Sequence, residues 1–166
     1  MLIEQVLINN AGIGLVHESF ADMRATYNRT FDVNVSSVAM AMDVFLPLLR
    51  ESGCGRVINV SSARGSLELS SSGKLPSTVV IAYSASKTAL NMLTVEYGKA
   101  AENSHVVFQA VSPGHCKTMF NNYRGRKDPL DGAKVIVALL DDDAGRFGPG
   151  FWQMEDNDEE PVRVPW

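Results

Sequence analysis

Short apolar runs alternate along the chain with longer segments in which apolar residues recur at helical spacing. The apolar runs cover residues 6–8, 56–60, 106–111 and 150–154. The helical segments cover residues 20–31, 35–49, 85–93 and 131–140. Apolar runs without strict alternation are typical of strands that are buried on both faces of a parallel sheet. Strands that alternate with such helices predict βαβ units with right-handed crossovers, and therefore an α/β fold.

Two further segments lack either pattern. Residues 66–77 are rich in Ser and contain Gly73 and Pro76, and residues 119–129 are polar. Gly, Pro and clustered small polar residues mark turns and irregular structure. We therefore expect both segments to be loops.

Composition and charge narrow the class of protein. The 166 residues correspond to one domain, and a hydrophobic content of 45% is enough for a core. With 15 Lys and Arg against 19 Asp and Glu, the net charge of −4 argues against a nucleic-acid partner. The sequence has neither a long apolar span nor a signal-peptide pattern, so we expect a cytoplasmic protein without membrane contact. Cys54 and Cys116 form neither a disulfide framework nor a metal-ligand spacing, so no metal is expected.

Small and polar residues follow three of the predicted strands, at 9–14, 61–65 and 112–118. In open parallel sheets, ligands bind outside the carboxyl ends of the strands. A single turn of this kind is most simply explained as ordinary strand-to-helix turn chemistry. Three such turns at one edge of a sheet favour a ligand site there.

Tyr83 and Lys87 lie four positions apart in a predicted helix, so their side chains share one helical face. A phenol has a pKa near 10 and exchanges protons poorly at neutral pH. A nearby ammonium favours the phenolate and lowers that pKa, which makes Tyr a usable general acid or base. Alone, such a pair is also common on surface helices.

Five motifs then follow one another along the chain. They are Asn9-Asn10-Ala11-Gly12, Val33-Asn34-Val35, Asn59-Val60-Ser61-Ser62 with Gly65, Tyr83-Ser84-Ala85-Ser86-Lys87, and Ser112-Pro113-Gly114 followed by Thr118. In this order they resemble the motifs of the short-chain dehydrogenase/reductase family. The resemblance covers residues 6–118 and implies a Rossmann-like, doubly wound parallel sheet. It also implies an NAD(P)-dependent oxidoreductase that reduces a carbonyl or oxidises an alcohol by hydride transfer.

The resemblance assigns catalytic roles to four residues. Tyr83 would be the proton donor or acceptor, and Lys87 would lower its pKa and hold the nicotinamide ribose. Ser62 would polarise the substrate oxygen, with Ser61 as the competing assignment. Asn34 would anchor a water in the proton path.

The resemblance also implies a cofactor, NADP or NAD, with NADP favoured. The residues expected to contact it are Asn10, Gly12, Tyr83, Lys87, Pro113, Gly114, Cys116 and Thr118. Asn10 and Gly12 would meet the adenosine side, and Cys116 and Thr118 the carboxamide. For Cys116 itself, a small apolar filler is favoured over a reactive thiol. The expected partners are a small carbonyl or alcohol substrate and, as in the family, a second copy of the chain.

Two features depart from the family. Ser62 and Tyr83 are 21 positions apart, so residues 66–78 are expected to be an insertion at the rim of the active site. The chain also begins directly at what would be the fourth strand of the family, without the Gly-rich turn that seats the pyrophosphate. Residues 1–166 would therefore be the C-terminal catalytic part of one Rossmann-type domain, holding strands four to seven. The first three strands, about 70–90 residues, would be absent.

This departure leaves two hypotheses open. The chain is an NAD(P)-dependent oxidoreductase by descent, or it is a catalytically inactive fragment that pairs through the open edge of its first strand. We expect the 166-residue chain alone not to turn over substrate.

Overall fold

The computed structural model describes residues 5–142, 145–155 and 158–166. The sheet has five strands in the order β1-β2-β3-β4-β5. The strands are β1 (Val6–Asn9), β2 (Gly55–Val60), β3 (Val106–Ser112), β4 (Gly150–Gln153) and β5 (Val162–Arg163). The first four are parallel, and β5 pairs antiparallel with β4. The predicted α/β class with parallel strands is confirmed.

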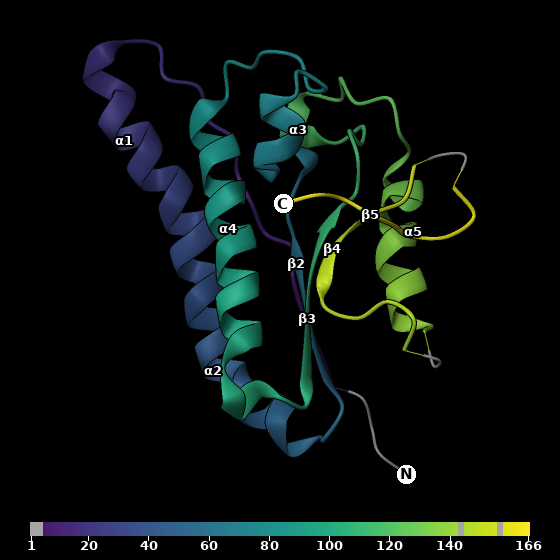
Figure 1. The fold of residues 1–166 in the computed structure, drawn as a ribbon. Coiled ribbons are helices and arrows are strands. Elements are labelled where there is room, and N and C mark those ends of the chain that lie inside the picture. The colour runs from purple at the N-terminus through teal and green to yellow at the C-terminus, as the bar shows by residue number, and fades with distance from the viewer. Residues whose placement is uncertain (1–4, 143–144, 156–157) are drawn as a thin grey trace.

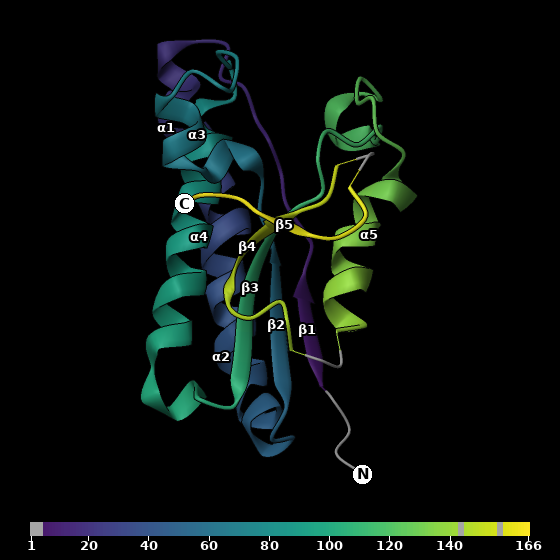
Figure 2. The ribbon, with the colours of Figure 1, turned by 45° about the vertical axis from the view of Figure 1, so that its right-hand side comes forward.

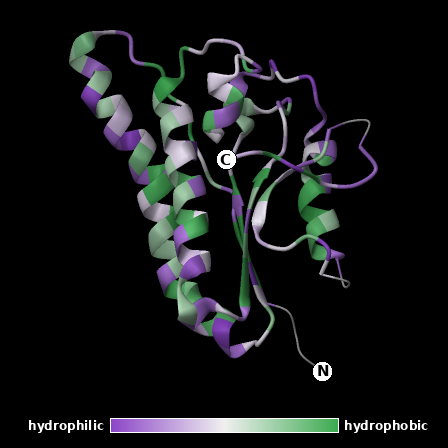
Figure 3. Ribbon diagram, viewed as in Figure 1, coloured by the Kyte–Doolittle hydropathy of each residue, from purple (hydrophilic) through white to green (hydrophobic). Residues whose placement is uncertain are grey.

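The helices cover both faces of this sheet (Figures 1 and 2). They are α1 (Phe20–Phe31), α2 (Ser37–Glu51), α3 (Leu67–Ser71), α4 (Ile81–Lys99) and α5 (Pro129–Leu140). Figure 2 shows α2 and α4 on one side of the strands and α5 on the other. The ribbon of α5 is mostly green in Figure 3, which marks hydrophobic residues.

Neighbouring residues of one strand supply the two halves of the core. Val57 packs with Met42 of α2 and Leu90 of α4, whereas Ile58 packs with Val135 and other residues of the α5 side. Both strand residues are completely buried. The continuous apolar run at 56–60 therefore reflects a strand that faces helices on both sides.

The segment from α1 to α2 differs from the two separate helices that periodicity predicts. A π-helical turn, η1 (Asp32–Ser36), joins them into one continuous stretch, Phe20–Glu51, of 32 residues. By length and composition alone this stretch could cross a membrane, a test that the core helix of a soluble protein also passes. Its C-terminal half packs on the sheet through Met42 and Leu46.

The predicted loop at 66–77 is wrong in its first part, because α3 forms there. The Ser66 hydroxyl caps this helix by accepting a hydrogen bond from the Leu69 amide at 3.0 Å. Leu69 then packs against the buried Phe151 and Val164. Local capping and one apolar contact thus outweigh the Ser-rich composition.

The C-terminal residues fasten α3 to the sheet. The Val164 amide donates to the Phe151 carbonyl at 2.8 Å, and the Glu68 amide of α3 donates to the Trp166 carbonyl at 3.2 Å. The Trp166 ring stacks on Phe151 with centroids 5.6 Å apart. Residues 162–166 therefore form a strap from β4 to α3.

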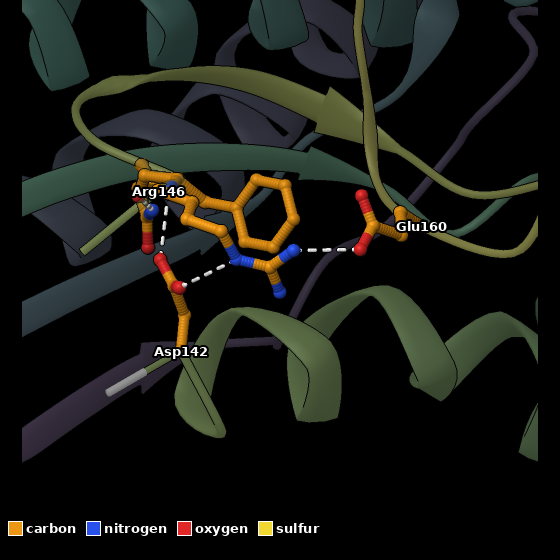
Figure 4. A network of polar contacts seen from close by, with 5 residues as sticks. Asp142, Arg146 and Glu160 are labelled. Carbon is orange, nitrogen blue, oxygen red and sulfur yellow. Dashed lines mark hydrogen bonds and ion pairs between the residues drawn. The ribbon is translucent and has the colours of Figure 1, made fainter. Parts of the chain in front are cut away.

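A polar network holds the connection between α5 and β4 (Figure 4). The Asp142 carboxylate accepts a hydrogen bond from the Phe147 amide at 2.7 Å and lies 3.4 Å from Arg146 Nε. Arg146 also pairs with Glu160 at 2.6 Å. The network links three segments around β4 and so fixes this end of the sheet.

Candidate active site

The turns after β1, β2 and β3 end at one edge of the sheet, as the sequence predicts. Asn9 of β1 is in register with Asn59 of β2, which is in register with Ala110 of β3. Asn9 Nδ2 donates to Asn59 Oδ1 at 2.8 Å, and Asn59 Nδ2 donates to the Thr94 hydroxyl of α4 at 2.9 Å. This chain of hydrogen bonds, partly buried at Asn9 and buried at Asn59, ties two strand ends to α4.

Tyr83, Ser62 and Lys87 meet above this edge. Tyr83 and Lys87 lie in the first two turns of α4, and Lys87 Nζ is 5.7 Å from the centroid of the Tyr83 ring. The Ser62 side chain lies close enough to the Tyr83 hydroxyl to lower its pKa. Lys87 Nζ donates to the Val60 carbonyl at 2.6 Å, which fixes the amine beside the end of β2.

The two neighbouring serines do different work. The Ser61 hydroxyl is buried and donates to Asn91 Oδ1 at 2.6 Å, inside the protein. Ser62 is partly exposed and is the serine that contacts Tyr83. This arrangement supports Ser62 over Ser61 as the candidate that faces a substrate.

Asn34 lies in the π-helical turn η1 and is completely buried. Its Nδ2 donates to the Ile13 carbonyl at 2.8 Å and to the Ser86 hydroxyl at 2.9 Å, and its Oδ1 accepts from the Ile13 amide at 2.8 Å. The side chain therefore ties the β1–α1 connection to α4. Its predicted role in holding a water remains a prediction.

The expected lowering of the Tyr83 pKa is not what the structure gives. Burial raises the pKa of the Tyr83 hydroxyl above its ordinary value, outweighing the lowering by the Ser62 hydrogen bond and by the charge of Arg64. Burial also lowers the pKa of Lys87 to about 8. Because burial disfavours the ammonium itself, Lys87 is a weaker source of positive charge than the sequence argument assumes.

Of the residues expected to contact a cofactor, Gly12 is brought close to the cluster. A Cβ at Gly12 would lie 3.4 Å from both Asn34 Oδ1 and Lys87 Nζ. Asn10 is exposed in the same turn. The missing side chain at Gly12 thus leaves a backbone surface directly beside the amine.

The remaining four candidates follow β3. Pro113 and Gly114 begin the turn, and Gly114 has a φ of +82°, which favours glycine. The Cys116 thiol is directed at α5: it donates to the Pro113 carbonyl at 3.3 Å, and a Cβ at Gly132 would lie 2.3 Å from its sulfur. This placement agrees with the favoured role of Cys116 as a filler. Thr118 caps the short helical turn η4 (Met119–Asn121).

Sequence reasoning missed two contacts of the site. Ser86 is an Asn34 partner although it lies inside the Tyr83–Lys87 motif, and the Val60 carbonyl binds Lys87. The position of Ser86, three residues after Tyr83, was a usable signal, whereas a backbone carbonyl has none. Phe120, by contrast, is an apolar residue of the 119–129 loop that the sequence offers as a pocket candidate, and its ring lies 5.3 Å from the Tyr83 ring, centroid to centroid.

Comparisons with known proteins bear on the family of this chain. The family model described as "short chain dehydrogenase" matches residues 5–129. A short-chain dehydrogenase/reductase of Aspergillus fumigatus is 38% identical over 175 residues, covering 97% of this chain and 66% of that protein. A short-chain dehydrogenase of Penicillium roqueforti is 31% identical with the same coverage of 97% and 66%. The chain belongs to the short-chain dehydrogenase/reductase family, and it spans about two thirds of the length of these relatives.

Solved structures share the fold. The carbonyl reductase Sniffer of D. melanogaster matches with a TM-score of 0.77 at 22% identity, covering 97% of this chain and 66% of that one. The NADPH-bound carbonyl reductase from chicken fatty liver matches with a TM-score of 0.72, also at 22% identity, covering 98% and 66%. At this identity the likeness establishes a Rossmann-like architecture and leaves the activity to be argued from the site.

Proposed function

We propose that this chain carries the proton-transfer centre of an NAD(P)-dependent oxidoreductase that reduces a carbonyl or oxidises an alcohol. The observation that carries the proposal is the cluster of Tyr83, Ser62 and Lys87 at the carboxyl edge of the sheet. A phenol beside a serine hydroxyl and adjacent to a lysine is equipped to protonate an oxygen that gains negative charge.

The proposed role of each residue follows from its environment. Because burial raises the pKa of Tyr83, its hydroxyl stays protonated at neutral pH and suits donation to a substrate oxygen. Ser62 would share a hydrogen bond with the same oxygen and so orient it. Lys87 would place positive charge near the phenolate that remains after the transfer. Asn34 would hold the β1–α1 connection in place and anchor a water.

The site fits the nicotinamide end of a dinucleotide. The bare backbone at Gly12 lies next to Lys87 Nζ, so no side chain at position 12 would compete with a sugar hydroxyl for the amine. Tyr83 and Lys87 would hold the ribose, while the residues expected to flank the rest of the cofactor are Asn10, Gly12, Pro113, Gly114, Cys116 and Thr118. When bound, the nicotinamide supplies or accepts the hydride. NADPH is bound by one structural relative and NADH by another, a 4-hydroxyisoleucine dehydrogenase; we favour NADP here.

Cofactor titration tests this proposal first. NADPH and NADH are titrated into the 166-residue chain while nicotinamide fluorescence is followed, and a carbonyl panel is then assayed. We expect saturable binding that Tyr83→Phe weakens, because the phenol would help to hold the ribose, and we expect that variant to lose about 10²–10⁴-fold of any turnover. A folded chain that binds neither cofactor at millimolar concentration would contradict the proposal.

The second candidate function is non-catalytic pairing through β1. This strand lies at the edge of the sheet, and Val6 and Ile8 are 38% and 41% exposed. An unpaired apolar edge favours association with another strand. Cofactor-independent association that is abolished by Ile8→Lys would support this candidate.

We also propose that the protein is cytoplasmic, acts on a small molecule and forms homo-oligomers through α2 and α4, the faces that the family resemblance suggests. Large apolar side chains are exposed on both helices, including Met40 at 69% and Met92 at 59%. Light scattering after size-exclusion chromatography tests the oligomer, and Met92→Glu should shift it to monomer.

A further inference from the structure

Phe120 belongs to the β3–α5 connection, and its side chain lies against Tyr83, the candidate proton donor. Its ring contacts the Tyr83 ring at a centroid distance of 5.3 Å and an interplanar angle of 57°. Half of the Phe120 side chain remains exposed, at 50%. An aromatic side chain that is half in water makes only part of the contact it could make in a core, so the ring covers Tyr83 from outside without being built into the core.

The Phe120 ring also lies against the turn after β1. A Cβ built at Gly14 would lie 2.9 Å from Phe120 Cζ, closer than real side chains approach. Glycine at this position therefore leaves the space that the tip of the ring occupies. The β1–α1 connection and the β3–α5 connection meet through this one aromatic ring, directly over Tyr83.

The turn that carries Phe120 is stabilised by hydrogen bonds within its own segment. Asn121 Nδ2 donates to the Cys116 carbonyl at 2.7 Å, and the Tyr123 amide donates to the Thr118 carbonyl at 2.8 Å. Asn122 and Tyr123 both have positive φ, 51° and 59°. Two successive residues other than glycine in this region are unfavourable, and the surrounding bonds maintain them. The backbone thus presents Phe120 in one defined direction.

We propose that Phe120 is a positioning residue that acts through Tyr83: its ring, seated in the space left by Gly14, keeps the phenol against Ser62 and shields it from water. This inference rests on the proposed function, in which Tyr83 exchanges the proton. Ligands that reach the Tyr83 hydroxyl then do so beside or beneath this ring.

The charges around the phenol determine what removal of the ring does. Arg64, beside the end of β2, lowers the pKa of Tyr83, and Lys87 lies under its ring, while burial raises that pKa. Removing Phe120 admits water and leaves both cations in place. More of the phenol is then ionised and open to a reagent.

Nitration by tetranitromethane tests the proposal without turnover, because this reagent attacks accessible phenolate. Peptide mass spectrometry follows Tyr83 in the wild type, Phe120→Ala, Gly14→Ala and the double variant. We expect the nitration rate of Tyr83 near pH 8 to rise in each single variant, because a less buried phenol is both more accessible and more easily ionised. The double variant should equal Phe120→Ala, because Gly14→Ala acts only by displacing the ring.

Three controls separate this role from a loss of fold. Phe120→Leu retains apolar cover and should keep most of the protection. Leu130→Ala removes an apolar side chain of α5 that is 80% exposed and should change nothing. Tyr97, at the far end of α4, donates to Asp43 at 2.7 Å and should react equally in all variants.

Unchanged Tyr83 nitration in either Phe120→Ala or Gly14→Ala overturns the proposal. This test is independent of the test of the proposed function. If the chain fails to bind NADPH but shows these nitration changes, the proposed role of Phe120 as a cover stands and only the proposed oxidoreductase function fails. Where turnover is measurable, Phe120→Ala should move the basic limb of the pH profile to lower pH.

Discussion

The contact between Gly65 and α4 offers the sharpest test of how the site is held together. Gly65 ends the short turn η2 (Ala63–Gly65) that follows Ser62. A Cβ at Gly65 would lie 2.8 Å from the Lys87 carbonyl carbon and 2.9 Å from its oxygen. Because the obstacle is helix backbone, the turn must move away if Gly65 becomes Ala.

The cost of Gly65→Ala can be estimated from the bonds that it disrupts. The Gly65 carbonyl accepts from the Thr88 hydroxyl at 3.0 Å and from Asn91 Nδ2 at 3.2 Å. Each bond contributes about 1 kcal/mol, and overpacking at a tight contact costs about 1–3 kcal/mol. Since displacement of the turn relieves the overpacking but breaks both bonds, we expect the free energy of unfolding to fall by about 2 kcal/mol.

Urea denaturation followed by circular dichroism measures this loss, with an unchanged slope as the sign of an unchanged unfolded state. Gly148→Ala is the matched control, because a Cβ there meets nothing within 4 Å, and it should stay within about 0.5 kcal/mol of wild type. A Gly65→Ala variant as stable as this control would refute the reasoning that close backbone approach requires glycine here.

Three further predictions concern single side chains. Burial lowers the pKa of Lys87 to about 8, so above that pH the unfolded chain binds more protons than the folded chain. The free energy of unfolding should therefore rise between about pH 8 and 10, and Lys87→Met should flatten this rise in urea titrations. Among the described residues, the buried Ser84 hydroxyl lacks a hydrogen-bond partner, so Ser84→Ala should stabilise the chain by about 1 kcal/mol, and a loss of stability would show a hidden partner. The Phe147 amide and then Arg146 hold the pKa of Asp142 below its usual value. The ionised Asp142 therefore stabilises the fold at pH values above its pKa in the unfolded chain, and this stabilisation is lost as the pH falls through its lower pKa in the folded chain. Asp142→Asn should remove this contribution to the acid dependence of the melting temperature.

The sequence predicts the parallel strands and the edge at which the site forms, because a strand buried on both faces of the sheet is apolar along its whole length. Val57 and Ile58 face opposite helices, so the run containing them is apolar throughout. Polar turn residues after three strands then mark the ligand edge. These features depend on local composition and on the rules of βαβ connection, which a sequence displays directly.

The features that sequence reasoning missed depend on contacts between distant segments. The α3 helix forms because Leu69 reaches Phe151 and Val164, residues far along the chain from it. The raised pKa of Tyr83 arises from burial by the surrounding chain, whereas its Lys87 neighbour is visible in the motif. The motif shows that Tyr83 and Lys87 are neighbours, but only the fold shows how far each is buried. Here burial raises the pKa of Tyr83, whereas the motif predicts that it is lowered.

The polar residues of the motifs differ in what they do for the fold, and this difference bears on the two candidate functions. Asn59 and Ser61 form hydrogen bonds inside the protein, so any folded chain needs them. Lys87 is different, because lowering its pKa from 10.5 to about 8 by burial costs the folded state on the order of 3 kcal/mol at neutral pH. A protein that only pairs through β1 gains nothing from this cost, and Lys87→Met would make it more stable. The proposed oxidoreductase function gives this buried amine a role beside Tyr83, whereas pairing through β1 gives it none. The same variant tests this comparison: Lys87→Met should raise stability at pH 7 while weakening NADPH binding, and a variant that is stabilised with unchanged cofactor binding would reverse the preference.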